Sequence, residues 1–407
     1  MIRCEPPSAI LLGAFDRFNY GDLLFPMVVG NALAVHSPGT ITAVHALIGS
    51  DFRRYGAMAT RSLKALYRPG ALAPGTVVIF AGGGTIGVDW SAMSANLLGR
   101  TGNAALYYLQ RLIGESAVNA LSRHSFGGRA PFPWVAGPGD FPVPVKVAYN
   151  AVGGSEFARL PLRVQEQTLN RLGQAAYLSV RDAETKRLFA PLESRLPVVL
   201  APDSAILMSE QYPIPWLETR ASSALRVLLD AGPYLCFQSN QRYARKHLDA
   251  IVAALEAIHA QYRLPVVLLP IGRYVGLDDQ VALRTIQGKL RSRARVVSAE
   301  ASLFEIMLTI AKATLFIGTS LHGAITAQSF AVPHLGLSDR PCKVDFYLET
   351  WDLPGQSRCP PLAEVPPRVG EVLSIPAAAR LSLRNELTVR AHRNFAAMAQ
   401  ACGLEWN

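Results

Sequence analysis

Short apolar runs that stop at glycine or polar turns recur along this chain, and segments with helical spacing follow them. Ala9 to Leu12 leads into a glycine-containing turn and a helix predicted from about Leu23 to Val35, and Tyr177 to Val180 leads into a further helix. Apolar runs of this length are typical of parallel strands that are buried on both faces. The repetition of strand, turn and helix therefore predicts an α/β fold with parallel sheets covered by helices.

The length of the chain, 407 residues, is sufficient for two domains, each with its own hydrophobic core. The strand-and-helix pattern occurs on both sides of a segment that carries Tyr212, Pro213, Pro215 and Trp216 in close order. We therefore predict two Rossmann-like domains that face each other across a cleft. The predicted parts are an N-terminal domain over 1–209, a linker over 210–223, a C-terminal domain over 224–377, and a helix over 378–407 that packs back across both domains.

The net charge of +10 favours acidic partners, but the arginines are dispersed along the chain. No block of Lys and Arg alternates with aromatic residues, and no helix-turn-helix, zinc-finger or RNA-recognition pattern is present, which argues against nucleic acid as a partner. An anionic small molecule, or a sugar carried on a lipid phosphate at a membrane surface, explains the charge with fewer assumptions.

No apolar run approaches the roughly 20 residues that a membrane-spanning helix needs. The N-terminus, MIRCEPPSAILLGAF, runs directly into a motif, so we interpret it as the first strand and not as a signal peptide. The five cysteines are scattered, with no paired spacing for a metal and no disulfide framework. These observations predict a cytoplasmic protein with reduced thiols, and they leave open a peripheral contact with the inner membrane face.

The stretch from Ala313 to Phe346 contains the strongest candidate for a functional site. Leu315 to Ile317 has the pattern of a buried strand, and Gly318 to Ser320 can turn the backbone and cap a helix that has His322 in its first turn. Ligands of open α/β sheets bind beyond the carboxyl ends of the strands, where helix N-termini attract anions. A titratable imidazole is therefore expected at a ligand site, and Lys343 follows one strand later.

A second candidate follows the first strand, where Asn19, Gly21 and Asp22 come together in the run Asn-Tyr-Gly-Asp. A strand, a turn with glycine and a helix form the opening of a nucleotide-binding type of unit, although this turn is not the G-x-G-x-x-G fingerprint. Two interpretations remain open from the residues alone. Asn19 and Asp22 cap the helix, or they contact a ligand.

Three consecutive glycines, Gly82, Gly83 and Gly84, follow the apolar run from Val77 to Phe80. Such a triplet indicates that the backbone approaches another group closely or takes φ values that other residues resist. Its N–H groups could bind a phosphate or a carboxylate, and a tight turn against a helix explains it equally well.

Arg181 and Asp182 stand directly after the strand from Tyr177 to Val180. The planar guanidinium donates two parallel hydrogen bonds and so suits a carboxylate or a phosphate at the carboxyl end of a strand. The alternative is a surface ion pair between the two residues, which would contribute little. Farther along, the polar run from Ser239 to Arg242 follows another predicted strand and is expected at the edge of the cleft.

The segment between the glycine triplet and residue 143 is less regular. A helix is predicted here over 104–121, as another is over 56–67 ahead of the triplet. The Gly-, Pro- and aromatic-rich run after 104–121 predicts a long loop that covers the cleft. Trp134 in this loop is either a platform on which a sugar stacks or a residue that holds the loop to the body of the protein.

Taken in order, these motifs resemble the polysaccharide pyruvyl transferases. The similarity rests on Ser-Leu-His-Gly at 320–323, Lys343 ahead of an aromatic residue, Ser-Val-Arg-Asp at 179–182, Asn-x-Gly-Asp at 19–22 and the glycine triplet. In that family the first block more often begins with arginine, so Ser320 is a departure that removes a guanidinium. Arg273, beyond the strand from Val266 to Leu269, is a candidate to replace that cation, or else a solvated surface arginine.

The resemblance implies a GT-B-like layout and ketal formation. The N-terminal domain, with the long loop after 104–121, would lie on the acceptor side of the cleft, and the C-terminal domain would lie on the donor side. Pyruvate from phosphoenolpyruvate would be transferred to two hydroxyls of a sugar, in a surface polysaccharide or its precursor, with release of phosphate. Lipid-linked and polymeric acceptors both fit, and no metal or cofactor beyond the donor is expected. The implied catalytic residues are His322 and Arg181, and the implied substrate contacts are Asn19, Gly21, Asp22, Gly82, Gly83, Gly84, Asp182, Arg273, Ser320, Gly323 and Lys343.

Two other functions stay open. A GT-B glycosyltransferase that uses a nucleotide sugar would share the fold, because a fold does not determine a function. It would need a carboxylate for the ribose hydroxyls, for which Asp339 and Asp345 are the candidates near His322. A catalytically silent glycan-binding relative is the second alternative, and it is suggested by the departure at Ser320.

Overall fold

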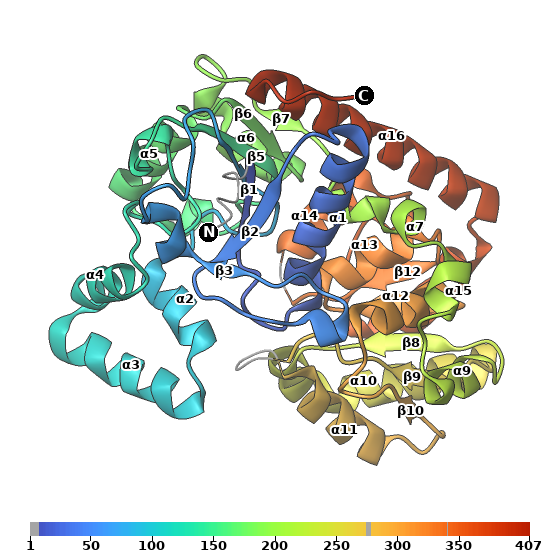
Figure 1. Cartoon of the computed structure of the whole chain (residues 1–407). Coiled ribbons are helices and arrows are strands. Elements are labelled where there is room, and N and C mark those ends of the chain that lie inside the picture. Colours follow the sequence, from blue (N-terminus) through green and yellow to red (C-terminus); the bar gives the residue numbers. More distant parts are fainter. Residues whose placement is uncertain (1–7, 274–277, 340) are drawn as a thin grey trace.

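Two parallel β-sheets form the framework of the protein. The computed structural model describes residues 8–273, 278–339 and 341–407. Within them, one sheet has seven strands in the order β3-β2-β1-β4-β5-β6-β7, and the other has five strands in the order β10-β9-β8-β11-β12. Figure 1 shows helices packed around both sheets. The predicted α/β class with two parallel sheets is confirmed.

The strands lie close to the apolar runs that predicted them. In the first sheet, Leu11 of β1 pairs with Val44 of β2 on one side and with Ile79 of β4 on the other, so β1 is central. The strands of this sheet are β1 (Ala9–Leu12), β2 (Thr42–Ala46), β3 (Arg61–Ser62), β4 (Val77–Phe80), β5 (Lys146–Val152), β6 (Tyr177–Val180) and β7 (Val199–Leu200). Those of the second sheet are β8 (Leu235–Gln238), β9 (Val266–Leu268), β10 (Arg295–Val296), β11 (Leu315–Gly318) and β12 (His334–Gly336).

The helices follow the strands as the pattern of the sequence predicts. In the first half they are α1 (Tyr20–His36), α2 (Trp90–Leu97), α3 (Arg100–Ile113), α4 (Glu115–Ser125), α5 (Leu162–Leu172) and α6 (Ala183–Leu188). Three short helices, α7 (Met208–Gln211), α8 (Ile214–Glu218) and α9 (Ser223–Leu229), connect the halves. The second half contains α10 (Gln241–Tyr262), α11 (Asp279–Lys289), α12 (Leu303–Ala311), α13 (Leu321–Ser329), α14 (Lys343–Trp351), α15 (Val365–Ser374) and α16 (Ala377–Cys402).

One hydrophobic cluster runs through both halves. It contains Leu11 of the first sheet and Phe316 of the second, and α1, α12, α13 and α16 contribute to it. Each sheet buries its other face in a cluster of its own. Because apolar area buried between the halves stabilises their contact, the carboxyl ends of the two sheets are held at a defined separation.

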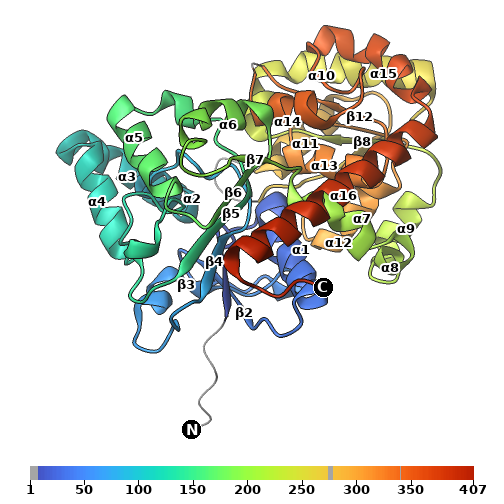
Figure 2. The ribbon, with the colours of Figure 1, turned by 90° about the horizontal axis from the view of Figure 1, so that it is seen from above.

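Helix α16 returns to the first sheet. Lys146 at the start of β5 donates a hydrogen bond to the carbonyl of Cys402 at 2.9 Å, and Tyr177 of β6 donates one to Oδ1 of Asn394 at 2.8 Å. Figure 2 shows α16 crossing from this sheet toward the second half. Its packing against both halves restricts their relative movement.

Two local predictions differ from the structure. Residues 56–67 form no α-helix, because Ser50 and Thr60 pair their backbones and hold the first part of this segment extended before a 3₁₀ helix at Leu63–Tyr67. The single helix predicted over 104–121 is divided between α3 and α4 at Gly114, whose φ of +87° interrupts a helix. After Lys343 the chain is rich in proline, yet α14 and α15 occupy much of this segment, since prolines at the first turn of α15 are compatible with a helix.

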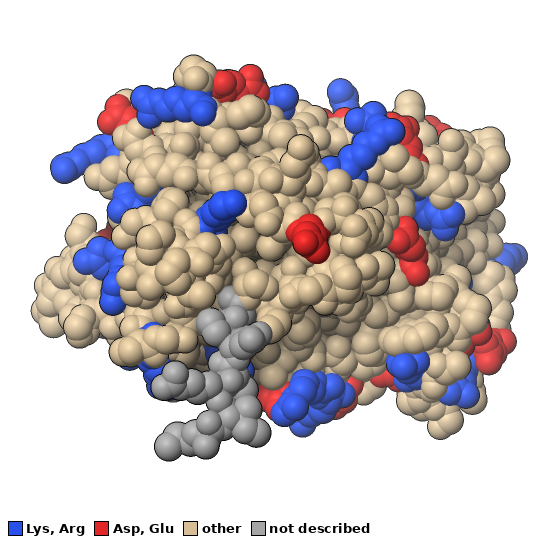
Figure 3. Space-filling view, turned by 45° about the horizontal axis from the view of Figure 1, so that its top comes forward, with Lys and Arg blue, Asp and Glu red and all other residues tan. Residues whose placement is uncertain are grey.

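The surface agrees with the dispersed charge of the sequence. On the face drawn in Figure 3, Lys and Arg side chains are scattered among uncharged residues and form no continuous stripe. In the part of the chain that the structure describes, none of the helices combines the length and the hydropathy that crossing a bilayer requires.

Candidate functional site

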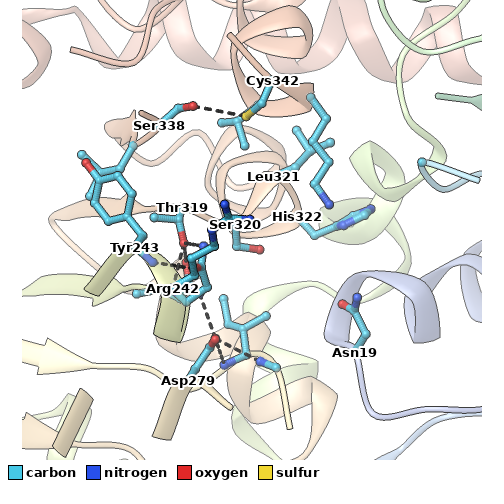
Figure 4. Close-up of a pocket in the computed structure, with 18 of the residues that line it drawn as sticks. Asn19, Arg242, Tyr243, Asp279, Thr319, Ser320, Leu321, His322, Ser338 and Cys342 are labelled. Atoms are coloured by element: carbon cyan, nitrogen blue, oxygen red, sulfur yellow. Dashed lines mark hydrogen bonds between the residues drawn. The ribbon is translucent and has the colours of Figure 1, made fainter. Parts of the chain in front are cut away.

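A cleft of about 720 Å³ lies between the carboxyl ends of the two sheets. Figure 4 shows Asn19 of the first half opposite residues of the second half, among them Ser320 and His322. Because the strands of each sheet are parallel, the turns that leave them all open toward the same side. The cleft residues that the sequence singled out are Asn19, Asp22, Gly84, Arg181, Asn240, Arg242, Ser320, His322, Asp339 and Lys343.

His322 is held in position by its own helix and by α1. The hydroxyl of Ser320 caps α13 by accepting a hydrogen bond from the amide of Gly323 at 3.2 Å, which places His322 in the first turn. Its imidazole meets the ring of Phe25 edge to face, with 5.1 Å between the ring centroids. A Cβ at Gly21 would lie only 1.9 Å from Nδ1 of His322. Gly21 therefore provides the space that the imidazole occupies. The sequence predicts Gly21 only as a substrate contact and does not predict this packing role.

Asp203 connects His322 with Arg181. Its Oδ2 lies 3.2 Å from Nη1 of Arg181 and 3.6 Å from Nε2 of His322, and its Oδ1 accepts a hydrogen bond from the amide of Ala205 at 3.0 Å. Burial opposes ionisation of this carboxyl, but the interactions with His322, Arg181 and Ala205 outweigh burial and lower its pKa. The separation of 3.6 Å is within ion-pair range and longer than a hydrogen bond.

Arg181 follows β6 and is almost completely buried, with 1% of its surface exposed. A Cβ at Gly153 would lie 2.8 Å from its Nε, and a Cβ at Gly84 would lie 3.2 Å from its Nη2, so glycine at both positions leaves room for the guanidinium. Asp182 caps α6 by accepting a hydrogen bond from Thr185 at 2.7 Å and is buried as well. The alternative of a surface ion pair between Arg181 and Asp182 is therefore wrong.

Asp22 and Lys343 bring opposite charges into the cleft. Burial raises the pKa of the Asp22 carboxyl, although the positive charges of Arg17, His322, Lys343 and Arg181 lower it. Burial, followed by the charge of Arg181, lowers the pKa of Lys343, which Asp22 partly offsets. Lys343 counts as exposed because much of its surface is accessible to solvent, but this surface faces the cleft. The amine is therefore surrounded by protein more than by bulk water, which agrees with its lowered pKa. A carboxyl and an amine with shifted pKa values in one cleft are typical of functional sites.

Asn19 combines the two roles that the sequence left open. Its Oδ1 accepts a hydrogen bond from the amide of Gly21 at 3.2 Å, which confirms the cap. Asn19 also pairs its backbone with Gly272 of the second half, and it lines the cleft. Contact with a ligand stays a prediction.

Gly82, Gly83 and Gly323 serve packing and do not line the cleft. Gly82 and Gly83 both have φ of +91°, which glycine adopts at little cost. A Cβ at Gly82 would lie 2.4 Å from the ring of Phe25, and one at Gly323 would lie 2.4 Å from the ring of Phe316. Gly84 is the member of the triplet that lines the cleft. Packing explains the other three glycines, and their contact with a substrate stays a prediction.

Arg273 is not among the residues that line the cleft. Its guanidinium lies over the rings of Phe18, at 3.9 Å from the centroid, and Tyr55, at 4.9 Å, and donates a hydrogen bond to the carbonyl of Ala301. It therefore cannot replace the missing cation at position 320, and it is not a solvated arginine either. Its stacking against Phe18 and Tyr55 ties the second half to the first.

Two cations of α10, Arg242 and Lys246, line the cleft in its place. Asn240 caps this helix through a hydrogen bond to the amide of Tyr243 at 2.9 Å, so both side chains project from the first turns. Lys246 pairs with Asp339 at 3.1 Å, whereas Arg242 has no ion-pair partner in the described parts of the chain. In the sequence, these cations are indicated by a capping Asn240 that is followed by two basic residues four positions apart. The prediction that the run from Ser239 to Arg242 lies at the edge of the cleft agrees with the positions of Asn240 and Arg242.

The remaining candidate side chains have structural partners. Trp134 is buried and donates a hydrogen bond from Nε1 to the sulfur of Met93 at 3.1 Å, so it holds its loop to the body and offers no platform for a sugar. Asp345 caps α14 by accepting from the amide of Cys342 at 3.1 Å. The buried carboxyl of Asp279 accepts hydrogen bonds from the amides of residues 271 and 272, and burial raises its pKa to about 7.

Within residues 8–273, 278–339 and 341–407, no three His, Cys, Asp or Glu side chains lie together as potential metal ligands.

Comparison with known families confirms the resemblance. The model of the polysaccharide pyruvyl transferase family matches residues 154–340 of this chain. This match includes Arg181, Asp203 and His322, while Asn19 to Asp22 and the glycine triplet precede it. Among proteins with curated descriptions, none matches the sequence.

Solved structures with the same arrangement include two UDP-GlcNAc 2-epimerases. The enzyme from Methanocaldococcus jannaschii, in complex with UDP-GlcNAc and UDP, aligns with a TM-score of 0.52 and 13% identity over 91% of this chain and 93% of that chain. The enzyme from Neisseria meningitidis, bound to UDP-GlcNAc, aligns with a TM-score of 0.52 and 10% identity over 96% of this chain and 99% of that chain. At these identities the likeness shows the fold alone, and it confirms the GT-B-like layout.

The N-terminal domain of trehalose-6-phosphate phosphatase from Candida albicans is similar in fold as well. It aligns with a TM-score of 0.51 and 10% identity over 99% of this chain and 98% of that chain.

Proposed function

We propose that this protein is a ketal-forming pyruvyl transferase that moves pyruvate from phosphoenolpyruvate onto two hydroxyls of a sugar. The observation that carries the proposal is the meeting of Arg181, His322 and Lys343, from the two halves of the chain, in one cleft around buried Asp203. A transferase with a carboxylate and a phosphate on its donor needs cations, and it needs a group that exchanges protons near them.

The cations of the cleft would bind the two anionic ends of the donor. Arg181 is fixed by Asp203 through Nη1, and its Nη2, beside Gly84, remains for a ligand. Lys343 would contact the other anionic group. Burial and the charge of Arg181 lower the pKa of its amine, and a bound anion would raise that pKa again, so the amine would become more fully protonated when the donor binds. Arg242 lines the same cleft and would supply the guanidinium that Ser320 lacks.

The reaction requires three proton transfers. The first sugar hydroxyl bonds to C2 of phosphoenolpyruvate while C3 receives a proton and becomes a methyl group. The bond between C2 and the phosphate oxygen then breaks, the second hydroxyl bonds to C2, and its proton leaves with the phosphate. His322 would deliver the proton to C3, and Asp22, whose pKa is raised, would accept the proton of the first hydroxyl. After the products leave, Asp22 would release its proton to solvent and His322 would take one up, so that both groups return to their starting states.

Asp203 would act as a positioning residue for His322. Nε2 of the imidazole is buried and faces Asp203, so Nδ1 at the wall beside Gly21 is the nitrogen that would exchange a proton with the substrate. A carboxylate on one ring nitrogen holds the imidazole in one tautomer and stabilises its protonated form. Catalytic hydrogen bonds are often long without substrate, and the 3.6 Å separation would shorten when the donor binds.

The test is phosphate release from phosphoenolpyruvate in the presence of oligosaccharide acceptors. Because a general acid or base contributes about 10²–10⁴-fold to the rate, His322→Ala should lose at least that much activity. His124→Ala, at an exposed histidine of α4, is the matched control and should retain the wild-type rate. Full phosphate release by His322→Ala would contradict the proposed role.

The product can be examined independently of the purified enzyme. Mass spectrometry of the surface polysaccharide, from cells with and without the gene, should detect a pyruvate ketal that depends on the gene. An unchanged ketal content would argue against the proposed reaction.

A glycosyltransferase that uses a nucleotide sugar is the second candidate, because the structural neighbours are nucleotide-sugar enzymes. Both carboxylates expected to bind ribose already have partners, since Asp339 lines the cleft but pairs there with Lys246, and Asp345 caps α14. Thermal-shift measurements with phosphoenolpyruvate, UDP sugars and GDP sugars distinguish the two. Stabilisation by a nucleotide sugar and not by phosphoenolpyruvate would favour the glycosyltransferase. A glycan-binding relative without activity would bind acceptor and release no phosphate.

A further inference from the structure

Helix α3 exposes an apolar face that no other part of the described chain covers. Its sequence, RTGNAALYYLQRLI, places Tyr108, Leu109, Leu112 and Ile113 on one side. Tyr108 is 69% exposed, Leu112 82%, Ile113 44% and Leu109 37%. Soluble helices normally turn such a stripe toward the core, so the exposed stripe requires an explanation.

The orientation of α3 is fixed by contacts on its polar side. Gln110 donates a hydrogen bond from Nε2 to the hydroxyl of Ser91 on α2 at 3.3 Å, which turns the polar side of α3 toward the body. The following helix is held as well, because Oδ1 of Asn119 accepts a hydrogen bond from the amide of Trp90 at 2.8 Å. The hairpin of α3 and α4 therefore presents its apolar face outward from a fixed base, and Figure 1 shows it standing out from the sheet at the lower left.

The charges around this face are almost all positive. The chain carries four arginines, at 100, 111, 123 and 129, and one acidic residue, Glu115, between positions 90 and 130. Arg111, Arg123 and Arg129 are exposed. A basic amphipathic helix with tyrosine and leucine on its apolar side is typical of the interface of an anionic membrane.

We propose that the hairpin of α3 and α4 binds an anionic lipid surface, with Tyr108, Leu109, Leu112 and Ile113 inserted among the lipids. Anionic headgroups would neutralise Arg111 and Arg123, whereas a second copy of the chain on the same face would bring arginines against arginines. The proposal rests on the hairpin alone and stands whether or not the cleft transfers pyruvate. It would hold the protein at a surface where lipid-linked sugars reside.

Flotation with vesicles tests the proposal with the full chain. Wild-type protein should float with vesicles of phosphatidylcholine mixed with phosphatidylglycerol, and much less with phosphatidylcholine alone or at high salt, since salt screens exposed charges. The double variant Tyr108→Ser/Leu112→Gln should bind the anionic vesicles at least about tenfold more weakly, because each inserted apolar side chain increases the affinity for the vesicle by about tenfold. Both side chains are exposed, so its melting temperature should equal that of the wild type.

Leu162→Gln is the matched control, because Leu162 is 77% exposed on α5 and lies outside the hairpin. It should float as the wild type does, and Arg111→Gln should weaken binding to anionic vesicles only. Hydrogen exchange should show vesicle-dependent protection confined to the segment 98–125. The proposal is overturned if wild-type protein binds no vesicle, if the double variant binds as tightly as wild type, or if light scattering shows a dimer of this chain that the double variant dissociates.

Discussion

The contact between Gly21 and His322 offers a direct test of the arrangement of the cleft. In Gly21→Ala, the new Cβ would lie 1.9 Å from Nδ1, 2.3 Å from Cγ and 2.6 Å from Cε1 of the imidazole. The φ of Gly21 is not positive, so alanine fits the backbone, and the steric conflict with the ring is the effect that remains. Since real Cβ contacts are wider than about 3 Å, the imidazole must move by roughly 1 Å.

The magnitude follows from what holds the ring. Phe25 contacts one side of the imidazole and Asp203 faces Nε2, so the ring cannot move without losing a packed neighbour or its carboxylate. Overpacking of this kind costs about 1–3 kcal/mol of stability. A displacement of about 1 Å at a reacting group costs roughly 10²-fold in rate. We therefore expect Gly21→Ala to lose phosphate release far more than it loses stability.

Gly30 of the same helix provides the control. A Cβ there would meet its nearest neighbour, the sulfur of Met58, at 3.7 Å, which is an ordinary contact. Gly30→Ala should therefore keep full activity and gain up to about 1 kcal/mol, because alanine favours the helix interior. Activity is measured as phosphate release, and stability by urea denaturation.

A double-mutant cycle separates packing from function. In the His322→Ala background the imidazole is absent, so Gly21→Ala should cost almost no stability there. If Gly21→Ala retained full activity, or if its stability cost persisted without the imidazole, the reasoning about this contact would be refuted.

Two further predictions concern buried carboxyls. Asp203→Asn should cost about 3 kcal/mol of stability, since it leaves the buried charge of Arg181 without its closest partner, and it should shift the pH profile of phosphate release, which a purely structural role would not do. Asp279 has a folded pKa of about 7, above its ordinary value near 3.9, so the folded protein binds the extra proton and loses stability as pH rises from about 4 to 7. Urea denaturation of Asp279→Asn should lack this loss, and its stability relative to wild type should rise by about 1 kcal/mol per pH unit between about pH 5 and 7. A difference that does not vary with pH would show that the Asp279 carboxyl is ionised in the folded protein at all these pH values.

The positions of the strands were predictable because they depend on neighbours in the sequence. Ala9–Leu12 and Tyr177–Val180 are apolar at every position or nearly so, and they are strands in the structure with the predicted bounds. The first-turn position of His322 was predictable for the same reason, since Ser320 caps α13 from two residues away. The helix predicted over 56–67 failed because its segment pairs with Ser50, and this pairing is not visible in helical periodicity.

The partners of the site residues depended on the tertiary structure. The residues that surround His322, namely Gly21, Phe25 and Asp203, are separated from it by more than a hundred positions, and the packing of α1 and α13 in a common core is what brings them together. Arg273 illustrates the converse, because its place after a strand favoured the cleft, yet the rings of Phe18 and Tyr55 hold it away.

By itself, the sequence determined the class of the fold and the turns at which functional side chains can emerge, because strands, helices and caps depend on residues within a few positions of one another. Which of these side chains share one cleft was decided by the contact between the two halves. That contact depends on apolar area buried by residues distant in sequence, and local patterns carry no record of it.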